Sequence, residues 1–276
     1  MNYKLGLFKS YFDERDFLYR SFIRLRALPS EFSIESKMTP VRNQSNEGSC
    51  AGHNAQGAKE FQEQIDLKKF ISLSPRYIYE YAKKISGHSE GTTLKAIVQA
   101  LLTIGICEEQ YWPYKAGDPS GKNPLADANA QKYKIKGYAR ITTVDELKQA
   151  IFNPYPQGGA ILAGLRLFKG AVGDDAKSTG ITPDPSCWDE WRDGPIGGHA
   201  IEPCAWNDNS PYYKNDGHIK FKGSWGEHFG AKGYHYFSYK NIKKNMMDCM
   251  ALIDIKGSAN ILTVANLPKK GEELWV

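Results

Sequence analysis

One cysteine, Cys50, follows a polar loop at the point where a helix is predicted to begin. Residues 43–49 form the loop, and small or apolar residues recur after Cys50 at helical spacing. A thiol at a helix N-terminus faces unsatisfied backbone N–H groups and the positive end of the helix dipole. Both favour the thiolate, which is a strong nucleophile. The position predicts a pKa for Cys50 below about 8.5, although a cysteine near a helix start is more often structural.

Gln44 lies six residues before Cys50 in the same polar loop. A loop that folds back over the helix start would aim the Gln44 amide at the same point as the backbone N–H of Cys50. Two such donors stabilise the oxyanion that forms when sulfur attacks a carbonyl. Read alone, Gln44 is more typical of a solvated loop residue.

A histidine and a tryptophan stand among small residues further along the chain. Residues 197–200 read Gly-Gly-His-Ala at the start of an apolar run, and the glycines leave room for a substrate backbone beside His199. Residues 223–226 read Gly-Ser-Trp-Gly, where the Trp225 indole can lie over a neighbouring ring and exclude water. Taken singly, the two motifs also fit a core histidine and an aromatic hairpin.

The elements that must position these residues follow from the spacing of apolar side chains. Helices are predicted to begin at 48–49 and 74–75 and to cover 93–104. The period then changes from 3.6 to 2, apart from a short helix capped by Thr143 and Glu146. The predicted strands are 133–138, 159–167, 199–206, 218–222, 233–239 and 249–255, and the predicted long loops are 113–131 and 169–197.

This order of elements predicts an α+β protein with a helical lobe and a β-rich lobe. We expect an N-terminal arm at 1–38, a helical lobe at 39–132, a β-rich lobe at 133–255 and a C-terminal tail at 256–276. The arm is too short for a separate inhibitory domain, and the sequence leaves its role open.

Together these motifs resemble the papain-like cysteine peptidases, particularly the compact prokaryotic-type members. Cys50 and His199 lie 149 positions apart, close to the roughly 130–150 typical of this family. The resemblance spans roughly residues 39–255 and implies a papain-like two-lobed fold with the active site in the cleft between the lobes. The matching stretches are 39–44 with 48–50, 105–106 with 111–114, 198–200, and 222–226 with Gly230 and 233–234.

The resemblance also implies roles for individual residues. Cys50 would be the nucleophile, His199 the base and later the acid, and Gln44 the side-chain donor to the oxyanion. The implied substrate-binding residues are Gly91, Thr92, Gly198 and Trp225, of which Trp225 would also shield the histidine. The implied chemistry needs no metal and no cofactor.

Three positions depart from the family pattern. Ala51 stands where an aromatic residue usually follows the nucleophile, and Glu47 replaces a cysteine that usually forms a disulfide. Gly223 occupies the position of the asparagine that orients the histidine. His53 lies about one helical turn after Cys50, and we expect it to pack within the helix rather than to react.

The leading hypothesis is a cysteine peptidase that hydrolyses peptide bonds through a thioester, slowly because of Gly223. The alternative is a catalytically weak or inactive papain-like protein that binds peptides. Other thiol acyl transfers, such as transpeptidation or amide hydrolysis, remain open. The expected partners are a peptide or protein substrate and a proteinaceous inhibitor.

Composition excludes other classes of function. The net charge is +5 and the basic residues are scattered, which argues against a nucleic-acid partner. No uncharged apolar run reaches 18 residues, and the N-terminus lacks a signal-like apolar core. The sequence therefore leaves the location as cytoplasmic or unknown, and no membrane attachment is expected. The five cysteines show no metal-binding spacing and are expected to be reduced, with Cys107, Cys204 and Cys249 buried.

Overall fold

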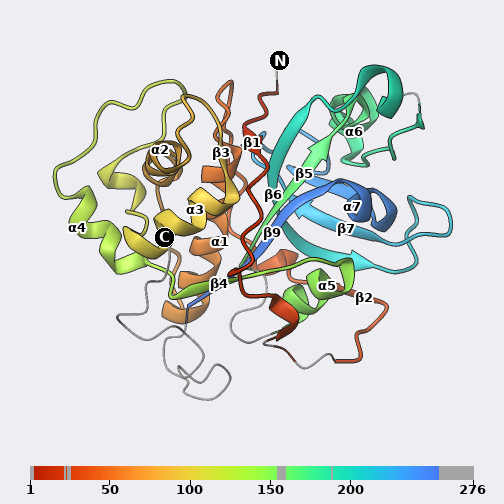
Figure 1. Cartoon of the computed structure of the whole chain (residues 1–276), viewed down its shortest axis with the longest axis horizontal. Helices are drawn as coiled ribbons and strands as arrows, with labels where there is room; N and C mark the ends of the chain where they lie inside the picture. Colours follow the sequence, from red (N-terminus) through yellow and green to blue (C-terminus); the bar gives the residue numbers. More distant parts are fainter. Residues whose placement is uncertain (1–2, 22, 24–25, 154–159, 188, 255–276) are drawn as a thin grey trace.

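The computed structural model describes residues 3–21, 23, 26–153, 160–187 and 189–254. Helices gather in the part of the chain after the N-terminal arm, and a sheet forms most of the remainder (Figure 1). The α+β prediction is therefore confirmed. None of the helices in these ranges is long and apolar enough to cross a membrane.

The helical part contains α1 (Cys50–Leu67), α2 (Pro75–Ser86), α3 (Leu94–Thr103) and the short α4 (Ala126–Ala130). Local chemistry fixes the start of α2, as predicted. The Ser74 hydroxyl accepts from the backbone N–H of Tyr77, and Pro75 occupies the first turn of α2. Thr93 caps α3 in the same way. The prediction of a continuous loop at 113–131 was wrong, because residues 126–130 form the short helix α4.

The sheet is largely antiparallel and centres on its longest strand, β6 (Gly197–Asn207). Along one part of its length β6 pairs with β5, which pairs with β9, and β9 pairs with β4. Along the other part β6 pairs with β2 and β7, and β7 pairs with β8. The bounds are β2 Glu31–Ser33, β4 Gly137–Arg140, β5 Ile161–Leu167, β7 His218–Lys222, β8 Tyr234–Ser238 and β9 Met246–Ile253.

Three predicted elements in the sheet half need correction. The last strand begins at Met246 rather than at 249. Residues 131–133 form a 3-10 turn, so the strand predicted at 133–138 begins at Gly137, as β4. The loop predicted at 169–197 contains α6 (Asp174–Thr179). The predicted capped helix is α5 (Val144–Phe152), and α7 (Tyr239–Asn245) follows β8. In α5 the Glu146 carboxylate accepts from Thr142, one residue earlier than a capping box requires.

The first residues of the N-terminal arm lie between the helices and the sheet. Its strand β1 (Leu7–Phe8) pairs in parallel with β3 (Thr92–Thr93) of the helical part and antiparallel with Gly198 of β6. Figure 1 shows this red segment running between the helices on the left and the sheet on the right. The arm thus joins the two parts through backbone hydrogen bonds.

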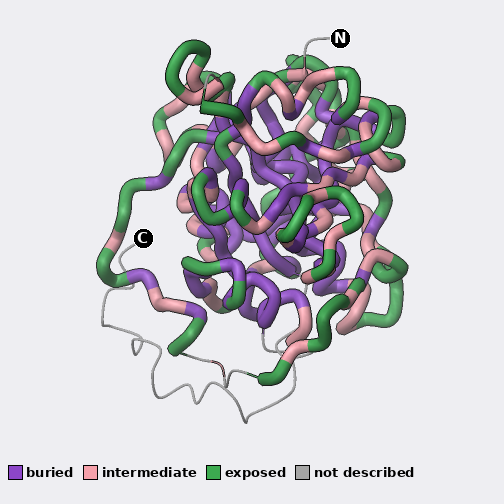
Figure 2. Tube along the Cα trace, turned by 90° about the vertical axis from the view of Figure 1, so that its right-hand side faces the viewer, coloured by how far each residue is buried: buried purple, intermediate pink, exposed green. Residues whose placement is uncertain are grey.

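The core lies where α1 meets the sheet. Helix α1 packs on β5 and β6, and its residues from Cys50 to Glu63 are buried. Figure 2 shows the buried segments gathered in the middle of the molecule and the exposed loops around them. Since Cys50 begins α1 and His199 lies on β6, the same packing that forms the core brings these two residues to one region.

Candidate active site

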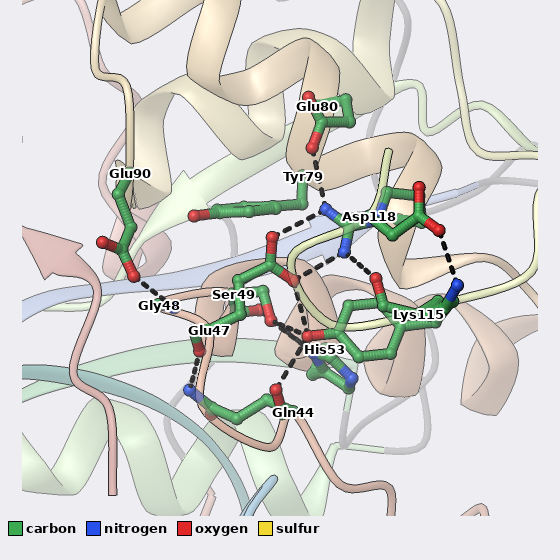
Figure 3. Close-up of polar contacts among 12 residues, drawn as sticks. Gln44, Glu47, Gly48, Ser49, His53, Tyr79, Glu80, Glu90, Lys115 and Asp118 are labelled. Carbon is green, nitrogen blue, oxygen red and sulfur yellow. Dashed lines mark hydrogen bonds and ion pairs between the residues drawn. The ribbon is translucent and has the colours of Figure 1, made fainter. Parts of the chain in front are cut away.

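The loop before Cys50 is tied to α2 by a buried ion pair. The Arg76 guanidinium donates to both carboxylate oxygens of Glu47 at 2.8 and 2.6 Å, and the Tyr114 hydroxyl donates to Glu47 at 2.7 Å. Arg76 is fully buried. Figure 3 shows Glu47 within this network, next to Gln44 and Ser49. Charge pairing thus holds the loop at the position where the family usually has a disulfide, and all five cysteines are free.

The Gln44 side chain is buried and oriented by two neighbours. Its Nε2 donates to the backbone carbonyl of Glu47 at 2.7 Å, and its Oε1 accepts from the Ser224 hydroxyl at 2.6 Å. Nε2 also donates to the backbone carbonyl of Lys4 at 3.0 Å. The amide therefore presents its N–H groups to a peptide carbonyl, here one from the N-terminal arm.

The Cys50 thiol begins α1 but is completely buried. Burial raises the pKa of Cys50, and backbone hydrogen bonds from Ala200 and Gly6 offset this only in part. The low pKa expected from the helix start is therefore wrong for this arrangement, because the arm and β6 remove water from the sulfur. The contact with Ala200 also shows that the strand carrying His199 passes directly beside Cys50.

The His199 imidazole lies flat against Trp225, with ring centroids 4.2 Å apart and planes inclined by 19°. Trp225 therefore covers the face of this ring, as the sequence predicted. His199 is 1% exposed, and within the described part of the chain neither of its ring nitrogens has a hydrogen-bond partner. Burial holds the pKa of His199 well below its usual range, and the neighbouring His235 and His53 lower it further.

His53 turns back along its own helix. Its Nδ1 lies 3.1 Å from the carbonyl oxygen of Ser49, and its ring meets Tyr114 edge-on at 4.5 Å. Burial lowers the pKa of His53 to about 4. This matches the expected packing role, and Figure 3 shows His53 beside Ser49.

The residues expected to bind substrate on the helical side contact the arm. Thr92 donates its backbone N–H to the Gly6 carbonyl at 2.8 Å. A Cβ atom on Gly91 would lie 2.6 Å from that same carbonyl oxygen and 2.6 Å from the Phe8 ring. Gly91 also has a φ of +77°, which favours glycine. Residues 6–8 therefore pack so closely against Gly91 and Thr92 that residue 91 has no room for a side chain.

The residues expected to bind substrate on the sheet side contact the arm too. Leu7 lies opposite Gly198 in the pairing of β1 with β6. The Tyr3 ring packs against Trp225, with centroids 5.0 Å apart. All four positions expected to bind substrate therefore contact residues 3–8 of the same chain.

Comparison with known proteins assigns this arrangement to a family. A model of the papain family cysteine proteases matches residues 28–254. The chain belongs to the papain family. Cathepsin K of Mus musculus is 30% identical over 206 residues, which cover 74% of this chain and 57% of cathepsin K. Falcipain-2b of Plasmodium falciparum (isolate 3D7) is 28% identical over 74% of this chain and 40% of its own length. This papain-family chain thus spans about half the length of these relatives.

Solved structures agree with the papain-like fold. Xylellain, a cysteine protease from Xylella fastidiosa, superposes with a TM-score of 0.76 at 26% identity, covering 91% of this chain and 96% of xylellain. The Carica candamarcensis cysteine protease CMS1MS2, solved in complex with E-64, has a TM-score of 0.59 at 20% identity, over 83% of this chain and 100% of its own. The expected papain-like fold is confirmed.

One feature of this papain-family site was missed by sequence reasoning. The space beside Gly223 is filled by the ring of His235, a residue of β8. The alternation of β8 gives the signal, because His235 and Phe237 alternate with the less buried Tyr234 and Tyr236. An inward-facing histidine directly after the Gly233–Tyr234 pair could therefore have been singled out.

Proposed function

We propose that this papain-family chain is a thiol peptidase that hydrolyses peptide bonds through a thioester on Cys50. The observation that supports this best is the hydrogen bond from Gln44 Nε2 to the Lys4 carbonyl. An extended peptide backbone thereby lies across the start of α1, with one carbonyl against the amide donor and Cys50 and His199 alongside.

The chemistry needs only residues of this chain and water. His199 takes the thiol proton, the Cys50 sulfur bonds to the substrate carbonyl carbon, and Gln44 donates to the oxygen that becomes negative. His199 then protonates the departing amine as the carbon–nitrogen bond breaks, which leaves a thioester. A water molecule, deprotonated by His199, attacks the thioester carbon, and release of the carboxylic acid returns the thiol.

In the arrangement described, residues 3–8 block this reaction. They cover Cys50 and His199 and occupy Gly91, Thr92, Gly198 and Trp225, so a substrate must displace them. We therefore infer a latent peptidase whose substrates, peptides or proteins, gain access only when the arm leaves.

Turnover would also be slow if no other group took the place of the missing asparagine. Gly223 offers no side chain to accept the ring N–H of His199. Loss of an orienting group costs a serine triad about 10⁴ in rate. We expect less here, on the order of 10²-fold, because a thiolate is intrinsically more nucleophilic.

The test uses the full chain with the arm displaced by Gly6→Val, whose Cβ atom would lie 1.8 Å from the Gly48 carbonyl oxygen. The exposed Cys187 is also changed to serine, so that an accessible thiol does not react. A peptide-directed irreversible thiol reagent should label Cys50 stoichiometrically, and the same protein should hydrolyse a fluorogenic peptide. Both signals should vanish in Cys50→Ala. Labelling without hydrolysis would instead identify a peptide-binding protein, and no labelling of a folded chain whose arm has been displaced would reject the proposal.

A further inference from the structure

The imidazole of His235 occupies the place where a side chain on residue 223 would begin. A Cβ atom built on Gly223 would lie 2.4 Å from His235 Nε2 and 2.8 Å from its Cδ2. The pairing of β7 with β8 explains this approach, because His235 lies opposite Phe221 and Gly223 donates its N–H to the Gly233 carbonyl. The Nε2 edge of the ring therefore faces the backbone from which an orienting amide would project.

Aromatic rings hold His235 in one orientation. It stacks on Phe229 with centroids 4.9 Å apart and planes inclined by 28°, and it meets Trp225 at 5.4 Å and 70°. The residue is only 2% exposed. Since Trp225 also carries His199 on its face, a single tryptophan positions both imidazoles.

Three ring nitrogens of these two side chains have no hydrogen-bond partner among the described residues. They are both ring nitrogens of His199 and the Nε2 of His235. Buried polar groups without partners are rare in folded proteins, so each one calls for an explanation. The two ring centroids are 6.5 Å apart, whereas a direct N–H···N bond needs about 5 Å between centroids. An approach of roughly 1.5 Å, or one bridging water, would join them.

We propose that His235 is the positioning residue for His199, whose ring N–H it accepts on Nε2 directly or through one water. This inference rests on the proposed peptidase function. The bond would keep the proton of His199 on the nitrogen that faces His235 and leave the other nitrogen free to take the Cys50 proton.

The acceptor role requires a neutral His235. Burial lowers the pKa of His235 to about 4, so the ring carries no charge at neutral pH and one nitrogen keeps its lone pair. The same side chain fills the volume that the missing residue 223 side chain leaves. The departure at Gly223 and the histidine at 235 are then two parts of one arrangement.

The first test is His235→Phe, which keeps the ring and its stacking on Phe229 but removes both nitrogens. His218→Phe is the matched control, because His218 is also buried in the sheet, with a pKa lowered to about 4. Measured with the fluorogenic peptide, His235→Phe should lower kcat roughly 10- to 100-fold with KM unchanged. His218→Phe should leave both constants unchanged. A folded His235→Phe with parental kcat would overturn the inference.

A reciprocal variant separates positioning from packing. His235→Ala opens the space beside residue 223, and Gly223→Asn added to it restores an acceptor from the other strand. The kcat of the double variant should be at least about tenfold higher than that of His235→Ala. Packing alone predicts no recovery, and the recovery can be measured even if His235→Phe does not fold.

The two proposals fail in different ways. If the parental chain labels at Cys50 but never hydrolyses the peptide, the peptidase function is wrong. The labelling rate then tests His235 by itself, because a positioned His199 accelerates attack by the sulfur. Equal labelling rates in the parental chain, His235→Phe and His235→Ala would reject the positioning role.

Discussion

The amide of Gln44 donates to the backbone carbonyl of Lys4, so a residue expected to stabilise an oxyanion is occupied by the chain's own arm. Lys4 is held from the other direction as well. Its ammonium group lies 3.3 Å from the Glu90 carboxylate, which also accepts the N–H of Gly48 (Figure 3). The arm and the loop before Cys50 therefore share hydrogen-bonding groups, and displacing one should affect the other.

Gly6→Val should displace the arm from the full-length chain. A Cβ atom on Gly6 would lie 1.8 Å from the carbonyl oxygen of Gly48, and backbone atoms cannot yield that much. The variant should therefore hydrolyse a fluorogenic peptide faster than the parental chain, by at least tenfold, in initial-rate measurements.

Lys9→Ala provides the control for this change, because Lys9 is an exposed residue of the same arm. It should leave the initial rate at the parental level. Equal rates in Gly6→Val and the parental chain, with the fold intact, would show that the arm does not limit access.

The pH dependence of Cys50 alkylation should report on the arm. Burial raises the pKa of Cys50, and only the thiolate reacts, so the parental rate should stay low until the pH exceeds about 8.5. In Gly6→Val, water reaches the sulfur and the helix start favours the thiolate, so the inflection should move to lower pH. Rates of iodoacetamide labelling across a pH series test this, with Cys50→Ser as the blank. The same inflection in both proteins would contradict the role given to the arm.

Local patterns predicted the elements that carry the site. The starts of α1, α2 and α3 follow from Cys50, Ser74 and Thr93, because caps and apolar spacing act within one or two helical turns. The strand carrying His199 was predicted from its apolar run, which is also a local pattern. Local patterns did not predict where β4 begins. The strand expected at 133–138 begins at Gly137, because its extent is set by pairing with β9 and not by its own residues.

Long-range contacts could not be predicted from such patterns. The arm pairs with β3 and β6, which lie more than 80 residues away along the chain. Glu47 was noted only as a missing cysteine, because its partner Arg76 is brought near by the packing of α1 on α2. His235 faces Gly223 through the register of two strands. Each relationship depends on tertiary placement.

Gln44→Ala should weaken acyl transfer more than substrate binding. Removing one oxyanion donor typically costs roughly 10²–10³ in kcat, and the backbone N–H that remains reduces the loss for a thiol enzyme. The comparison belongs in the Gly6→Val chain, where Lys4 no longer occupies the amide. Ser224→Ala should have a smaller effect in the same direction, because Ser224 only orients Gln44 through its Oε1. A raised KM with unchanged kcat in Gln44→Ala would remove it from the oxyanion role.

Glu47→Gln should destabilise the fold in a pH-dependent way. Burial alone would raise the pKa of Glu47, but hydrogen bonds from Arg76 and Tyr114 outweigh it and lower the value below 4.5. A lowered carboxyl pKa contributes stability that is present above the unfolded value and is lost as pH falls through the folded value. Removing one partner of a buried pair costs about 3–5 kcal/mol.

Denaturant unfolding at several pH values tests this prediction. The difference in unfolding free energy between the parental chain and Glu47→Gln should be largest near pH 7 and should narrow below about pH 4.5. Asp118→Asn is the control, because Asp118 pairs with Lys115 at the surface, and it should leave the unfolding free energy unchanged at pH 7. A pH-independent difference for Glu47→Gln would mean that lost packing, not the charge pair with Arg76, holds the loop that carries Cys50.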